Sequence, residues 1–126
     1  MQTVSTSFRL FGRSHDDVLD VEIDAAMARR KVSGWVGMDV SCMMNGEKPI
    51  LGYEDERAYW FVPVLVYSST HGVIGEAGTV RVDAVTGNFD RSMDAARSLF
   101  IAGCKIAGLR DAELNQAVQN FEQVTL

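Results

Sequence analysis

The sequence predicts an α+β fold, in which a long helix packs on an antiparallel sheet of about four strands and a helical pair follows at the C-terminal end. Three patterns predict this class. Residues 58–67 are β-branched, aromatic and apolar at both alternating sets of positions, residues 78–87 alternate between apolar and polar side chains, and helical spacing precedes and follows these two runs. A strand that is apolar on both faces must be covered twice, whereas an alternating strand has one face in water. The two runs therefore form the predicted spine of the sheet.

Composition and charge limit the classes of function. The 126 residues suit one domain, residues 1–126, which can bury a core without disulfides or metal. The formal net charge is -5, and the cationic cluster Arg29-Arg30-Lys31 fits the later part of a helix that follows acidic residues. Because nucleic-acid binding requires basic stripes, we expect no nucleic-acid partner.

Targeting and membrane segments are not expected. Residues 1–10 lack a basic head followed by an apolar stretch, and no apolar run approaches the roughly 20 residues that cross a bilayer. We therefore expect a cytoplasmic protein without a membrane partner.

The long helix is predicted from about Asp20 to about Met43. Its apolar stripe recurs at spacings of three and four and consists of Val21, Ala25, Ala28, Val32, Trp35, Val36, Val40 and Met43. A competing strand signal overlaps its start, where residues 19–23 alternate between apolar and acidic side chains. Gly34 and Gly37 lie inside the helix and favour a kink or an earlier end.

Shorter elements surround the spine. Residues 3–11 are predicted to form a strand or an extended arm, and residues 49–53 a short strand. Pro63 has no amide hydrogen to donate, so we expect a bulge at its position in the strand. Thr86 and Gly87 predict a hairpin turn after the second spine strand.

Capping signals mark the ends of further helices. Residues 14–17 resemble a capping box. Ser92 is a good N-cap for a helix that Gly108 closes, and Asp111 can cap a last helix. These two helices form the predicted C-terminal pair.

The connection between the two spine strands, residues 68–77, is rich in glycine. Glycine permits positive φ and close backbone approach, so two interpretations are open: a loop that contacts a ligand or partner, or a long hairpin with bulged strand ends. Common turn chemistry favours the hairpin. The candidate recognition loop would combine Tyr67, His71, Glu76 and Arg81 in one polar site, although these residue types are also typical of an ordinary surface.

The sequence contains no catalytic, metal or cofactor signature. A nucleophile–base pair would have to use Cys42 or Cys104 with His15 or His71, and both cysteines lie in apolar helical contexts that disfavour the thiolate. The two histidines and two cysteines lack zinc-ligand spacing. We expect free buried cysteines, with a disulfide as the alternative, and no cofactor. An enzyme that uses His71 and nearby acids is the weakest functional hypothesis.

Residues 20–88 resemble the PepSY-like domains. The features that carry the resemblance are an alanine-rich helix, Val36-Gly37, Gly46-Glu47-Lys48-Pro49, Tyr59-Trp60-Phe61-Val62-Pro63-Val64, Gly75-Glu76-Ala77-Gly78 and Val82-Asp83-Ala84-Val85-Thr86-Gly87. The resemblance implies a cystatin-like curved sheet over a helix, and a non-catalytic role such as inhibition or protein binding. Residues 92–124 fall outside the pattern.

Two functional hypotheses follow. The first is a non-enzymatic protein-interaction or inhibitory module that binds a protein partner or forms a dimer, because a strand that is apolar on both faces needs cover from both sides. The second is a protein that binds a small apolar ligand between helix and sheet, in a candidate pocket lined by Trp35, Trp60, Phe61 and Met43 or Met44. Buried aromatic residues usually fill cores, which is the simpler interpretation of these side chains.

Overall fold

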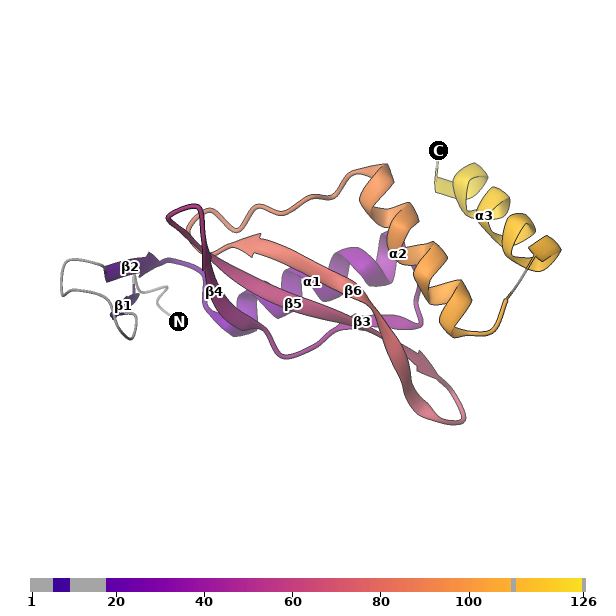
Figure 1. Cartoon of the computed structure of the whole chain (residues 1–126), viewed down its shortest axis with the longest axis horizontal. Coiled ribbons are helices and arrows are strands. Elements are labelled where there is room, and N and C mark those ends of the chain that lie inside the picture. Colours follow the sequence, from indigo (N-terminus) through magenta and orange to yellow (C-terminus); the bar gives the residue numbers. More distant parts are fainter. Residues whose placement is uncertain (1–5, 10–17, 110, 126) are drawn as a thin grey trace.

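The computed structural model describes residues 6–9, 18–109 and 111–125. In chain order its elements are β1 (Thr6–Arg9), β2 (Val18–Val21), α1 (Ala25–Asp39), β3 (Met44–Gly46), β4 (Ile50–Glu54), β5 (Arg57–Ser68), β6 (Gly72–Asp83), α2 (Met93–Ile106) and α3 (Asp111–Thr125). The predicted α+β class is confirmed, since three helices accompany an open antiparallel sheet of four strands in this described part of the chain. The β1–β2 hairpin lies at one end of the molecule, and α2 and α3 lie at the other (Figure 1).

β5 is the centre of the sheet. β6 pairs antiparallel with its whole length on one side, while β4 and β3 share the other side in succession. Pro63 lies in register with Thr79 of β6. The predicted bulge at Pro63 is therefore wrong, and the register shifts lie at Val64/Leu65 and Val66/Tyr67. The missing amide hydrogen of Pro63 is tolerated because it falls where β4 has ended and β3 has not begun.

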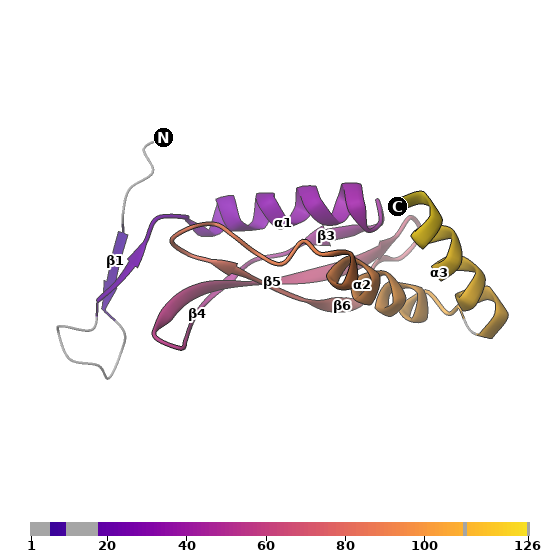
Figure 2. The same cartoon turned by 90° about the horizontal axis from the view of Figure 1, so that it is seen from above.

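One face of β5, which we call the inner face, packs against α1 to form the core. The inner-face residues are Ala58, Trp60, Val62, Val64 and Val66, and all five are buried. They meet Ala28, Val32, Trp35 and Val36 of α1, which runs along that side of the sheet (Figure 2). Each fully buried valine contributes roughly 1.5–3 kcal/mol through removal of its side chain from water.

The predicted long helix is too long at both ends. Asp24 caps α1 by accepting a hydrogen bond from the Met27 amide at 2.8 Å, so the helix begins at Ala25. The competing strand signal is the correct one for Val18–Val21, which forms β2 and pairs with β1. The helix continues through its two glycines to Asp39, four residues short of the predicted end.

The C-terminal helical pair forms as predicted. Ser92 caps α2 by accepting from the Ala95 amide at 3.1 Å, and Gly108 follows the helix with φ of 95°. α3 packs on α2 through Phe100 and Phe121, whose stacked rings lie 4.4 Å apart between centroids. The capping box predicted at residues 14–17 lies outside the described residues.

The C-terminal pair does not cover the second face of β5, although the two apolar faces of this strand predict cover on both sides. A Cβ on Gly78 would lie 2.9 Å from Leu99 of α2, so α2 approaches the sheet at this glycine. Gly78 is the register partner of Val64, an inner-face residue. Since directly paired residues share a face, α2 lies on the same side of the sheet as α1.

Candidate functional site

The second face of the sheet, which we call the outer face, carries a continuous apolar strip. It consists of Tyr59, Phe61, Pro63, Leu65 and Tyr67 of β5, with Ile50 of β4 and Val73 of β6 as their register partners. The β5 members are only half-buried and stand outside the core cluster. Ile50 is 67% exposed and Val73 52% exposed.

A charged bridge crosses the outer face at one end of this strip. Arg81 of β6 forms an ion pair with Glu54 of β4, and so spans the central strand. Its guanidinium lies 4.4 Å from the centroid of the Tyr59 ring, within cation–π range. The Tyr59 ring in turn meets Phe61 edge-on. The bridge neutralises both charges and partly covers this end of the strip.

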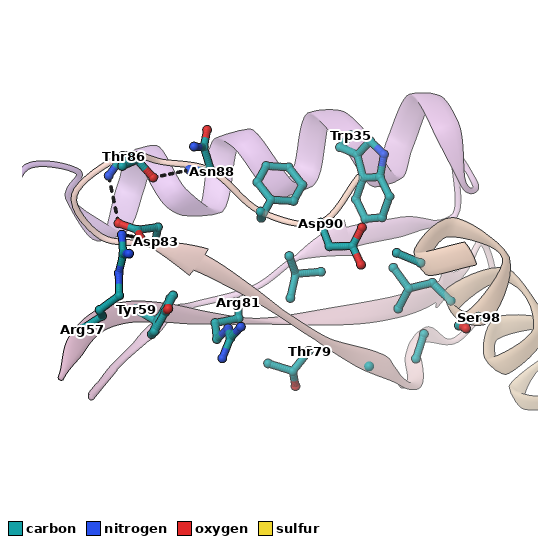
Figure 3. A pocket seen from close by; sticks show the side chains of 16 residues that line it. Trp35, Arg57, Tyr59, Thr79, Arg81, Asp83, Thr86, Asn88, Asp90 and Ser98 are labelled. Atoms are coloured by element: carbon teal, nitrogen blue, oxygen red, sulfur yellow. Dashed lines mark hydrogen bonds and ion pairs between the residues drawn. The ribbon is translucent and has the colours of Figure 1, made fainter. Parts of the chain in front are cut away.

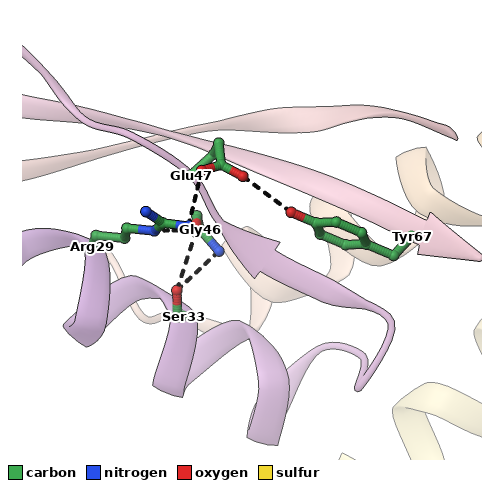
Figure 4. Close-up of polar contacts among 5 residues, drawn as sticks. All are labelled: Arg29, Ser33, Gly46, Glu47 and Tyr67. Carbon is green, nitrogen blue, oxygen red and sulfur yellow. Dashed lines mark hydrogen bonds and ion pairs between the residues drawn. The ribbon is translucent and has the colours of Figure 1, made fainter. Parts of the chain in front are cut away.

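A second polar network closes the other end of the outer face (Figure 4). The Tyr67 hydroxyl donates to Glu47 at 3.0 Å, and Glu47 pairs with Arg29 of α1 at 2.9 Å. Arg29 also donates to the Gly46 carbonyl at 3.1 Å, and the Gly46 amide donates to Ser33 at 3.0 Å. Burial and the Glu47 carboxylate raise the pKa of Tyr67. The network fixes Tyr67 and ties β3 to the helix.

A groove of about 630 Å³ lies beside the free edge of β6 (Figure 3). Consecutive β6 residues, 77–81, form one wall, while residues 86 and 88–90 and the start of α2 form the other. Trp35, Phe89 and Leu99 contribute its apolar surface. Trp35 and Phe89 meet edge to face with centroids 5.6 Å apart. We call this cavity the edge groove.

The β6 backbone directs hydrogen-bonding groups into the edge groove. The Ala84 amide donates to Ala58 of β5, whereas the Asp83 amide points away from β5 and donates to the Asn88 carbonyl at 2.9 Å. Because alternate residues of an edge strand point their N–H and C=O groups outward, those of Thr79 and Arg81 also point away from β5. Within the described residues, no hydrogen bond engages the backbone groups on this side of those two residues.

A carboxylate-capped turn holds the end of β6 beside the groove. Asp83 accepts hydrogen bonds from the amides of Val85 at 2.8 Å and Thr86 at 2.9 Å, and forms an ion pair with Arg57. Burial alone would raise the pKa of Asp83, but these amide donors and the guanidinium outweigh it and hold the pKa below its ordinary value. The predicted hairpin at Thr86 and Gly87 is wrong: the chain does turn here, with φ of 79° at Gly87, but it continues to α2 instead of returning as a strand.

The residues of the candidate recognition loop do not converge on one site. The connection is a tight hairpin, as the favoured interpretation predicted, and His71 lies in its exposed turn with Nδ1 2.8 Å from the Thr70 hydroxyl. Tyr67, Glu76 and Arg81 lie along the outer face, where each has a different partner. The four residues are thus distributed along the hairpin and share no cavity.

The candidate apolar pocket between helix and sheet does not form from its four residues. Trp60 and Phe61 are neighbours on β5 and point to opposite faces. Trp60 is a core residue whose indole N–H donates to the Ile23 carbonyl at 2.6 Å. Trp35 borders the edge groove, whereas Met43 is 41% exposed beside β3. The simpler interpretation as core is correct for Trp60, and the pocket that the ligand hypothesis required is absent at these residues.

The two cysteines are not joined in a disulfide and differ in exposure. Both are free; Cys42 is exposed beyond the end of α1, which corrects its predicted helical burial, and Cys104 is half-buried. Burial raises the pKa of the Cys104 thiol, which disfavours the thiolate. His15 lies outside the described residues. Among the described residues, no three histidine, cysteine or acidic side chains gather to hold a metal ion, and none of the helices is long and apolar enough to span a membrane.

No family model, curated protein or solved structure matches the chain. The resemblance to PepSY-like domains therefore stays a prediction.

The edge groove was not evident from the sequence. Its apolar surface comes from Trp35 of α1, Phe89 of the segment after β6, and Leu99 of α2. Each of these residues is typical of a core position when considered alone. The only sequence signal was the alternation in residues 78–84, which indicates a half-exposed strand but does not show that the strand lies at an edge.

Proposed function

We propose that this protein is a non-enzymatic interaction module that pairs with a second copy of itself through the outer face of its sheet. One observation carries the proposal: the central strand is apolar on both faces, yet α1 and α2 pack on the same face. Exposed apolar strips of this kind, bounded by polar groups, are typical of protein interfaces. Ile50 and Val73, both more than half exposed, flank the strip on either side of β5.

The charges support self-association through this face in particular. The formal net charge of -5 makes two copies repel at long range. On the outer face, however, Arg81 is neutralised by Glu54, and Glu47 by Arg29. Two such faces related by a two-fold axis can pack apolar centre on apolar centre without unpaired charges of like sign.

The non-enzymatic part of the proposal rests on the chemistry of the described side chains. His71 is exposed in a turn, and burial raises the pKa of the Cys104 thiol, which disfavours the reactive thiolate. The resemblance to PepSY-like domains implies the same kind of role.

Sedimentation velocity over a concentration series tests the proposal. The wild-type chain should shift from monomer to dimer as its concentration rises. Ile50→Glu places a charge on the outer face of each copy, and burial of two unpaired carboxylates should weaken association at least about 100-fold. Met38→Glu is the matched control, because Met38 is 86% exposed on α1, away from the sheet, and should leave association unchanged.

Two outcomes would contradict the proposal: a wild-type chain that stays monomeric at millimolar concentration, or a dimer that Met38→Glu weakens as much as Ile50→Glu does. Circular dichroism of the three proteins should overlap, because both positions are largely exposed in the monomer.

A further inference from the structure

The free edge of β6 is a template for an additional strand. Thr79 and Arg81 direct backbone N–H and C=O groups away from β5, and no described residue bonds to them on that side. Successive outward-pointing residues of a strand lie about 7 Å apart. An extended polypeptide repeats its own N–H and C=O groups at this spacing, whereas a compact small molecule does not.

The edge groove provides room beside that template. Five consecutive β6 residues, 77–81, line it, so the cavity follows the strand instead of ending at a single point. The opposite wall separates from β6 after Asn88, whose carbonyl makes the last bond to the strand, and continues to α2 with Ala95 and Ser98 facing the cavity. Figure 3 shows the cavity between the β6 arrow and this segment.

The side chains that line the groove determine which side chains an added strand would need. Alternate residues of such a strand would face the apolar surface made by Trp35, Phe89 and Leu99. Asp90 lies in the groove wall and is exposed, with its carboxylate accepting the Ser92 amide at 2.9 Å. This carboxylate lacks a cationic partner among the described residues, unlike Asp83 of the same groove.

We propose that the edge groove binds an extended segment of a partner protein, which joins the sheet as a strand beside β6, with apolar side chains at alternate positions and a basic side chain directed to Asp90. Strand addition of this kind takes its affinity from main-chain hydrogen bonds and its specificity from alternate side-chain pockets. The site lies on the edge opposite to β4. It shares Tyr59 and the Arg81 bridge with one end of the apolar strip, whereas Phe61, Ile50 and the other members of the strip do not line it.

Synthetic ten-residue peptides test this proposal directly. The probes have valine at alternate positions and lysine, serine or glutamate at the others, and binding is followed by fluorescence anisotropy. Lysine-containing peptides should bind more tightly than glutamate-containing ones, and Asp90→Asn should remove that preference. Amide hydrogen exchange at Thr79 and Arg81 should slow in the complex, because both amides become hydrogen-bonded.

Backbone-methylated peptides separate strand addition from other modes of binding. Two versions of the best peptide carry N-methyl groups on one or the other set of alternate amides. The version methylated on the edge that faces β6 should bind at least about tenfold more weakly, because it loses its donors to β6 carbonyls. If both versions bind like the parent peptide, the segment does not add as a strand and the proposal fails.

Variants of the protein give an independent readout. Thr79→Pro removes an outward amide and should abolish peptide binding, whereas Thr79→Val changes only the side chain and should not. Should the proline variant fail to fold, Ser98→Trp fills the groove from an exposed helix position and should abolish binding with the fold intact.

Three results would overturn the proposal: no binding by any peptide of the series at millimolar concentration, unchanged exchange at Thr79 and Arg81, or equal binding by the wild type and Ser98→Trp. Binding of an apolar small molecule in place of peptides would count against it too. The Ile50→Glu variant should keep wild-type peptide binding, which distinguishes this site from the self-association face.

Discussion

The turn after β6 allows a quantitative prediction on Asp83. Its side chain is only 10% exposed, and it accepts from the Val85 and Thr86 amides while also pairing with Arg57. The Arg57 side chain is 56% exposed, so water screens the ion pair. Asp83→Ala removes all three interactions, whereas Arg57→Ala removes only the ion pair.

The expected losses of unfolding free energy differ between the two variants. Each amide left without its acceptor costs about 1–3 kcal/mol, and the lower end applies because Val85 and Thr86 are exposed and regain water. Asp83→Ala should therefore cost about 2–3 kcal/mol. A screened surface ion pair contributes roughly 0–1 kcal/mol, so Arg57→Ala should cost less than about 1 kcal/mol.

Urea unfolding at one fixed protein concentration measures both losses, and repeating it across pH adds a second check. The folded pKa of Asp83 is depressed, so its stabilisation is complete above the unfolded value of about 3.9 and is lost as pH falls through the folded pKa. The difference in unfolding free energy between wild type and Asp83→Ala should therefore become smaller in acid, as Asp83 is protonated. Equal losses of unfolding free energy for Asp83→Ala and Arg57→Ala would show that the ion pair, and not the two amide hydrogen bonds, stabilises the turn.

Two further predictions concern packing and thiol exposure. Gly34→Ala should raise the unfolding free energy by up to about 1 kcal/mol, because its added methyl meets nothing within 4 Å. Gly103→Ala should be less stable than Gly34→Ala, because its methyl would lie 2.3 Å from the terminal methyl of the buried Met44, which must move. Thermal unfolding compares the two variants, and equal stabilities would contradict this packing. Cys42 should react with iodoacetamide faster than Cys104 at pH near 8, because Cys104 is half-buried and burial raises its pKa, and mass spectrometry of single-cysteine variants would detect the reverse order.

Local patterns in the sequence were sufficient to predict most of the fold. The two spine strands, the Ser92 cap and the Gly108 helix end all depend on neighbouring residues, and the structure confirms them. The error in the long helix has a physical cause. Residues 18–24 satisfy both periodicities, and the choice is made by the pairing of β2 with β1 and by the cap at Asp24. The pairing of one strand with another cannot be predicted from a short stretch of sequence.

The candidate sites were harder to predict, because they depend on which face each element covers. The two apolar faces of β5 were evident, but the position of α2 depends on close approach at Gly75 and Gly78, where added Cβ atoms would meet Ile106 and Leu99. Small residues permit a helix to approach the sheet closely, but they do not indicate which face of the sheet the helix approaches. The edge groove depends on backbone groups, which every residue carries, so no side-chain pattern could indicate it.

In the proposed dimer, the outer face of one copy meets the same face of a second copy. The most direct measurement is isotope-filtered NMR on a mixture of labelled and unlabelled chains, which detects only contacts between copies. We predict intermolecular contacts from Phe61, Leu65 and Ile50, with none from Met38 on α1. Intermolecular contacts from Met38, or no intermolecular contacts at concentrations where sedimentation shows a dimer, would contradict association through the outer face.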